Sequence, residues 1–307
     1  MRILVTGQRG FVGQHLKDRM KARFPQSEIL SSSPDIRDAE AVDTAIAACK
    51  PDHCIHLAAI SSIGDARQDP NHAWQVNLHG TLHVARSMQR HAPEGTVLFA
   101  STAEAYGSTF QRGLPVTENA PLAPGNTYAA TKAAADLALG AMAKEGLNVI
   151  RMRPFNHTGP GQSVDFVVPA FASQIAHIAK GLQPPEIHVG NLDAQRDFLD
   201  VRDVCDAYLD VLMTAPSLER GTILNLCSGQ TRSIRSILDD LIAISGIKAD
   251  IIIDPTRLRP SDTPIARGDA TLARSTLGWA PRIPWLQTLD DIYRDSLQQA
   301  TANGLSL

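Results

Sequence analysis

Three residues in the first half of the chain have types and spacing that could perform acid–base chemistry. Tyr128 and Lys132 form a YxxxK pattern, which a helix would place on one face. A neighbouring ammonium favours the phenolate, so we expect Lys132 to lower the tyrosine pKa from its usual value near 10. Such a tyrosine could exchange a proton with a carbinol oxygen, which the hydroxyl of Thr102 could hold. These residues predict a catalytic group rather than a surface Tyr–Lys pair.

A glycine-rich stretch separates the first apolar segment from the first helical pattern. Gly7 permits a tight turn, Gly10 lets the backbone approach a pyrophosphate, and Gly13 lets the helix pack close to the sheet. The phosphates would lie at the helix N-terminus, where free N–H groups and the helix dipole favour anions. We therefore interpret the stretch as a dinucleotide-binding site rather than as glycines that only form turns. Its predicted cofactor residues are Gly7, Arg9, Gly10, Phe11, Val12 and Gly13.

The end of the second predicted strand bears on the choice of cofactor. An acidic residue there usually holds an NAD ribose, but this chain has Ser31 and Ser32. Serine hydroxyls could bind a 2′-phosphate without repelling it, and Arg9 could supply the opposite charge. These residues favour NADPH, although NADH remains possible. Asp35 and Ile36 follow the strand and could flank the adenine, with the aspartate accepting from its amino group.

The elements that must position these groups alternate between strand and helix in the first half. Apolar periodicity predicts strands at 2–5, 28–32, 53–59, 96–101 and 147–152, and helices at 11–23, 39–49, 74–89 and 126–143. This alternation predicts an α/β fold, a doubly wound (Rossmann-type) parallel sheet covered on both faces. The less regular second half predicts helices at 167–180, 201–213 and 233–245, strands at 222–227 and 249–253, and a basic loop at 254–262.

Composition excludes several other classes of protein. The 307 residues are 43% apolar and 20% charged, with a net charge of −3, which excludes a disordered, collagenous or disulfide-stapled chain. Near-neutral charge argues against a nucleic-acid or membrane-surface partner. The four cysteines form no CxxC pair, so we predict no metal site. Without a long apolar run or a signal-peptide pattern, we expect a cytoplasmic protein.

Taken together, the motifs resemble the extended short-chain dehydrogenases/reductases that modify nucleotide sugars. The matching pieces are residues 6–13, 56–59, 77, 101–102, 106–107, 128–132 and 153–156. The resemblance implies cofactor contacts from Leu57, Ala58, Ala59 and Asn77, although Asn77 could instead bond the backbone inside its helix. It also implies a Rossmann domain of residues 1–156 plus 197–228, and a smaller mixed α/β substrate domain of residues 157–196 plus 229–307. The family's habit is a homodimer formed through long helices such as 126–143.

The second half is similar to the branch that holds GDP-mannose dehydratases and GDP-4-keto-6-deoxy-D-mannose reductases. The resemblance implies that Asn156, Arg196 and Arg259 meet the nucleotide diphosphate, with Asp262 beside them. Guanidinium forks match phosphate oxygens, which agrees with this role. The alternative for the arginines is a surface salt bridge to the aspartate that follows each of them.

Residues 102 to 104 bear on whether the chemistry is dehydration or reduction. Dehydratases of this branch place a proton-transferring residue between the threonine and the glutamate, whereas this chain has Ala103 between Thr102 and Glu104. The resemblance therefore implies reduction of a GDP-linked 4-keto-6-deoxy sugar, with Thr102, Glu104, Tyr128 and Lys132 as catalytic candidates. A 4,6-dehydratase, a C4 epimerase and a non-enzymatic nucleotide sensor remain as alternatives.

Overall fold

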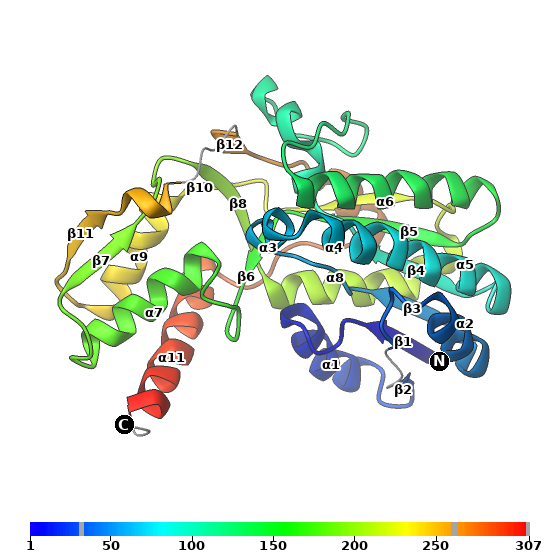
Figure 1. Cartoon of the computed structure of the whole chain (residues 1–307), viewed down its shortest axis with the longest axis horizontal. Coiled ribbons are helices and arrows are strands. Elements are labelled where there is room, and N and C mark those ends of the chain that lie inside the picture. Colours follow the sequence, from blue (N-terminus) through cyan, green and yellow to red (C-terminus); the bar gives the residue numbers. More distant parts are fainter. Residues whose placement is uncertain (31–33, 259–262, 305–307) are drawn as a thin grey trace.

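Six parallel strands form the central sheet of the computed structural model, which describes residues 1–30, 34–258 and 263–304. Their order is β2-β1-β3-β4-β5-β9 (Figure 1). The direction of winding changes between β1 and β3, where ligands of such sheets bind at the carboxyl ends of the strands. The predicted doubly wound fold is therefore confirmed. The strands are β1 (Arg2–Thr6), β2 (Glu28–Leu30), β3 (His53–His56), β4 (Thr96–Ala100), β5 (Val149–Pro154) and β9 (Ile223–Leu226).

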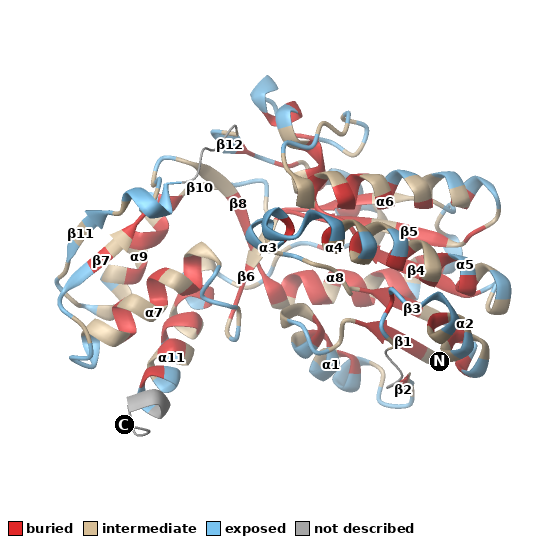
Figure 2. Ribbon diagram, viewed as in Figure 1, coloured by how far each residue is buried: buried red, intermediate tan, exposed pale blue. Residues whose placement is uncertain are grey.

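Helices cover both faces of this sheet because its strands are apolar on both sides. Ile3 and Val5 of β1 pack in one core with α1 (Phe11–Arg23) and α8 (Val201–Thr214). Leu4, between them, packs in a second core with α2 (Ala39–Cys49), α5 (Thr81–His91) and α6 (Thr127–Lys144). Figure 2 shows the sheet and the inward sides of these helices as buried. The predicted parallel sheet thus has two apolar faces.

The helix predicted over residues 74–89 is interrupted in the structure. The chain forms α3 (Ile63–Gln68), α4 (Pro70–Trp74) and a π-helical turn, η1 (Gln75–Gly80), before α5 begins. The turn holds Asn77, whose side chain bonds to residues outside the helix. Such turns often mark functional positions. A 3₁₀ segment, η2 (Ala103–Arg112), similarly follows β4.

The second half builds a smaller unit with a core of its own. A small sheet has the order β10-β8-β12, and β6 also pairs with β8, while β7 and β11 form a separate pair. Because β8 begins at Gln195, the domain boundary predicted at residue 197 falls within this strand. The strands are β6 (Asn156–Thr158), β7 (Glu186–Val189), β8 (Gln195–Asp200), β10 (Thr231–Ser233), β11 (Asp250–Ile253) and β12 (Ile265–Ala266). The helices of this unit are α7 (Val167–Ala179), α9 (Ile234–Ser245), η4 (Pro255–Arg257) and α11 (Trp285–Gly304). Two further helices, η3 (Ala215–Ser217) and α10 (Thr271–Leu277), pack against α8 of the central-sheet unit.

Aspartates at the junction of β8 and α8 tie the two units together. Thr288 of α11 donates to Oδ2 of Asp200 at 2.7 Å, and Arg202 bridges Asp200 and Asp291 at 2.7 Å each. Asp203 accepts from two backbone N–H groups just before α11. These bonds fix the direction in which β8 enters the smaller unit. Of the helices in the described ranges, none has the length and apolar character needed to cross a bilayer.

Candidate active site

The predicted catalytic residues meet at the carboxyl end of β4. Thr102 begins η2, just beyond that strand, and its side chain is hydrogen-bonded to Tyr128. Tyr128 lies in the first turn of α6, which begins where the side chain of Asn126 accepts from the N–H of Ala129. This cap fixes the start of the helix and hence the position of Tyr128. The structure thus brings Thr102 and Tyr128 together, as predicted.

The electrostatic environment of Tyr128 differs from the sequence prediction. Burial raises the pKa of Tyr128 to about 12, and the charge of Glu104 raises it further, although the bond to Thr102 opposes both. The expectation that the Lys132 ammonium lowers this pKa is therefore wrong. Lys132 donates from Nζ to the carbonyl of Ala100 at 2.6 Å and lies 4.3 Å from the Phe99 ring centre. Tyr128 is consequently a protonated phenol at neutral pH.

Lys132 is itself enclosed next to a buried carboxylate. Burial lowers the pKa of Lys132 to about 7, and Asp136, one turn later in α6, opposes this shift. Asp136 is fully buried, and its oxygens accept from Ser101 at 2.6 Å and from Arg153 at 2.8 and 2.9 Å. Arg151 adds a bond at 3.0 Å. Burial alone would raise the pKa of Asp136, but these partners lower it.

The network around Asp136 was not predicted from the sequence. The sequence pattern that could have indicated this network is Asp136, four residues after Lys132 in the same helix, together with Arg151 and Arg153 in the next strand, β5. A charge buried at that spacing needs partners, and the arginines supply them. Ser101 and Ala100 are neighbours at the end of β4, so the network and the Lys132 bond hold the same strand end.

The glycine loop has the geometry that a dinucleotide requires. Gly7 has a positive φ of 73°, and a Cβ built there would lie 2.6 Å from the backbone nitrogen of Ala58. Gly10 begins α1 without a side-chain cap in the structure as described, which leaves the first amides of the helix for a ligand. The residues present therefore fit a bound pyrophosphate. A Cβ on Gly13 would meet Gly7 and Gln8 at 2.6 Å, so Gly13 is required by the loop itself rather than by packing on the sheet.

Residues predicted around the adenine are arranged differently from the expectation. Both oxygens of Asp35 are held by Arg37, with the shortest contact at 2.5 Å, and this partner lowers the pKa of Asp35 to about 2. The side chain of Ile36 is buried in the core against α5 and α2, and its contact with the adenine stays a prediction. Arg9 is exposed beside Gly10. Ser31 and Ser32 lie outside the described residues.

The loop after β3 connects the glycine loop to α6. Ala58 donates its N–H to Thr6 at 3.3 Å, and Leu57 and Ala59 flank it as half-buried residues. Asn77 exchanges two hydrogen bonds with the backbone of Ile60, at 2.8 and 3.1 Å. It also donates to Thr131 at 2.9 Å, next to Lys132. Asn77 therefore joins two elements of the site and does not bond within its own helix through its side chain.

Arg196 approaches the catalytic group from the small sheet. It lies on strand β8, and its charge opposes the rise that burial causes in the pKa of Glu104. The predicted alternative, a salt bridge to Asp197, is wrong because Asp197 accepts from Ser228 and Gly229 instead. Asn156 lies on β6, beside β8 in the same sheet. Arg259 and Asp262 lie outside the described residues.

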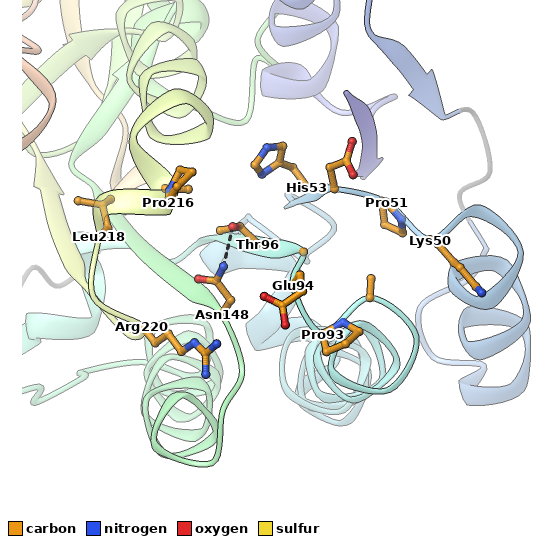
Figure 3. A pocket seen from close by; sticks show the side chains of 14 residues that line it. Lys50, Pro51, His53, Pro93, Glu94, Thr96, Asn148, Pro216, Leu218 and Arg220 are labelled. Atoms are coloured by element: carbon orange, nitrogen blue, oxygen red, sulfur yellow. Dashed lines mark hydrogen bonds between the residues drawn. The ribbon is translucent and has the colours of Figure 1, made fainter.

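A cavity of about 590 Å³ lies at the opposite edge of the central sheet (Figure 3). Its lining includes His53, which begins β3, Thr96, which begins β4, and Asn148, which precedes β5. Glu94 and Arg220 contribute opposite charges to its wall. These are the amino ends of the strands, so the cavity is separate from the catalytic group.

A Rossmann-type sheet with a glycine loop and a Thr–Tyr–Lys group defines an extended short-chain dehydrogenase/reductase. A family model described as GDP-mannose 4,6 dehydratase matches residues 22–292. The chain is 37% identical to the GDP-6-deoxy-D-mannose reductase of Pseudomonas aeruginosa. The aligned stretch of 297 residues covers 96% of each protein. It is 30% identical to the GDP-6-deoxy-D-talose 4-dehydrogenase of Aggregatibacter actinomycetemcomitans, over 97% of this chain and 98% of that protein.

Solved structures agree with this family. The structure of RMD from Pseudomonas aeruginosa complexed with NADPH matches with a TM-score of 0.90 and 34% identity, covering 97% of this chain and 99% of that one. The chain belongs to the GDP-mannose 4,6-dehydratase family of nucleotide-sugar enzymes.

Proposed function

We propose that this enzyme uses NADPH to reduce the C4 ketone of GDP-4-keto-6-deoxy-D-mannose to GDP-6-deoxy-D-mannose, that is, GDP-D-rhamnose. The carrying observation is the hydrogen bond between Thr102 and a Tyr128 that burial keeps protonated. A ketone reduction needs a proton for the new alkoxide, and a neutral phenol can give it. The likeness to a named reductase along nearly the whole chain supports the same reaction.

The chain's own residues have separate tasks in this proposal. NADPH supplies a hydride to C4 when bound, and Gly7, Gly10 and the first turn of α1 hold its pyrophosphate. Thr102 positions O4 of the sugar, and Tyr128 donates a proton to that oxygen. Lys132 stands behind Tyr128 and binds the nicotinamide ribose. Remote contacts to the nucleotide orient the ketone before the proton moves.

Substrate residues belong to the smaller unit in this proposal. Asn156 and Arg196 bind the diphosphate, together with Arg259 and Asp262, which lie outside the described residues. Glu104 lies near both Tyr128 and Arg196, so its charge acts on both. Residues 1–156 plus 197–228 bind the cofactor, and residues 157–196 plus 229–307 bind the sugar nucleotide.

The contacts to the cofactor are part of the same proposal. Arg9, Ser31 and Ser32 bind the 2′-phosphate of NADPH, while Leu57, Ala58 and Ala59 flank the dinucleotide. We further propose a cytoplasmic homodimer. Leu137 on the outer face of α6 is 60% exposed and offers apolar surface to a second copy, and the four cysteines are buried free thiols, as in reducing compartments.

The test couples NADPH oxidation to product analysis. With the 4-keto sugar prepared by a dehydratase, wild-type enzyme should consume NADPH and form the D-manno product. Tyr128→Phe should lower kcat by about 10²–10⁴-fold, because it removes the proton donor alone. Tyr293→Phe in α11 is the matched control and should leave kcat unchanged.

Three results would contradict the proposal. Near-wild-type turnover in Tyr128→Phe would remove the assigned proton donor. Release of a 4-keto sugar from GDP-mannose without added NADPH would identify a dehydratase. A product with the talo configuration at C4 would place the sugar with its other face toward the nicotinamide.

A further inference from the structure

Two arginines stand directly opposite each other in the small sheet. Arg232 of β10 is the register partner of Arg196 in the antiparallel β8–β10 pair. Directly opposed residues project from the same face of a sheet, and like charges at such positions destabilise it. An anion beside the two guanidinium groups would relieve this repulsion.

An aromatic side chain fixes the position of Arg232. Its guanidinium carbon lies 4.9 Å from the ring centre of Trp285, at the start of α11. Trp285 in turn contacts Phe198 of β8, with ring centres 5.7 Å apart. Phe198 follows Arg196 by two residues and so shares its face of the strand. The stacking holds the guanidinium plane on the same face as Arg196.

Arg232 has no counter-ion within the part of the chain that the structure describes. Its Nε atom is buried without a hydrogen-bond partner, and no described residue accepts from either Nη atom or forms an ion pair with it. Burial lowers the pKa of Arg232, and Asp197 and Asp240 act on it only through space. Asp197 is already occupied, since both its oxygens accept from residues 228 and 229. A half-buried cation with unused donors is costly to keep without a ligand.

The same face of the sheet also carries Asn156, which is assigned to the diphosphate together with Arg196. Asn156 of β6 is the register partner of Phe198 in the parallel β6–β8 pair. Asn156, Arg196 and Arg232 therefore project from one face of three neighbouring strands. Two guanidinium forks and an amide on one surface match two adjacent phosphate groups better than they match a single carboxylate.

We propose that Arg232, held by Trp285, is a second phosphate-binding arginine beside Arg196 and grips the diphosphate of the nucleotide sugar through its Nη atoms. This inference rests on the proposed function, since it assumes a nucleoside diphosphate-sugar in this site. Arg232 binds the substrate and takes no part in proton transfer.

Calorimetry with four ligands tests this assignment. Arg232→Gln should weaken the binding of GDP and of inorganic pyrophosphate at least about tenfold, because charge-assisted bonds are lost. Guanosine affinity and NADPH affinity should stay at wild-type values. Arg235→Gln is the matched control, because Arg235 is exposed in α9 and its side chain pairs with Asp239 one turn on. Arg232→Lys, which keeps a cation over Trp285 but lacks the fork, should also weaken GDP binding.

The outcomes separate this inference from the proposed function. Wild-type GDP affinity in Arg232→Gln, alongside a loss in Arg196→Ala, overturns the role of Arg232 and leaves the reductase intact. An equal loss of guanosine affinity overturns the phosphate assignment, because it points to the base. If Arg232→Gln fails to fold, wild-type GDP affinity in Arg232→Lys overturns the inference. Unchanged GDP affinity in both Arg232→Gln and Arg196→Ala overturns both proposals.

Discussion

The substitution Asp136→Asn tests whether the buried network behind Lys132 supports the site. Asparagine keeps the volume of the side chain but removes the charge, and its amide NH₂ would face a guanidinium. The carboxylate now accepts four hydrogen bonds of 2.6 to 3.0 Å from Ser101, Arg151 and Arg153. Removing one partner from a buried ion pair costs about 3–5 kcal/mol. For a chain of 307 residues, this corresponds to a fall in Tm of about 5 to 8 °C.

The assay is thermal unfolding followed by circular dichroism, with Asp43→Asn as the control. Asp43 also pairs with an arginine, Arg90, but on the surface, so its loss should change the stability far less. The pKa of Asp136 is lower in the folded protein than its ordinary value of 3.8. Its stabilising contribution is thus present above that value and is lost as the pH falls through the lower, folded value. Equal Tm values for the two variants at pH 7 would refute the reasoning.

Three further predictions concern the cofactor and the lysine. Gly7→Ala should abolish NADPH binding. Gly113 has a similar φ of 74°, but a Cβ there would lie in open space, so the Gly113→Ala variant should bind NADPH normally. Equal losses of NADPH affinity in the two variants would mean that backbone strain alone matters. Burial lowers the pKa of Lys132 to about 7, so if Lys132 acts as an ammonium, kcat should decline as the pH rises through about 7. A flat pH profile of kcat between about pH 6 and 9 would contradict this role. Arg9→Ala should weaken NADPH more than NADH in a fluorescence titration, since NADPH alone carries the 2′-phosphate, and equal weakening would make Arg9 a general loop residue.

Local periodicity was sufficient to predict the central sheet and the glycine loop. The strands of the first half are apolar runs bounded by turns, and the helices between them have 3.6-residue spacing, so both signals are contained within short windows. The loop at Gly7 needs residues of one type at fixed intervals, which the sequence displays directly.

Features that depend on distant pairing could not be predicted in this way. Strands β6, β10 and β12 have three residues or fewer, too short for any periodic signal, and only their pairing with β8 places Arg196 on a strand. The pKa of Tyr128 depends on how deeply α6 packs, which no spacing reveals. The π-helical turn at Asn77 likewise depends on bonds to Ile60 and Thr131, far away in the sequence.

The position of β9 has a consequence for synthesis on the ribosome. β9 closes the central sheet beside β5, yet it is translated only after β6, α7, β7, β8 and α8. Until then, a nascent chain that has already folded β1 to β5 presents β5 as an open edge with unpaired N–H and C=O groups. Growing chains fold as they emerge, and such edges promote association between neighbours. Chains that stop before residue 223 should therefore aggregate more than chains that include β9.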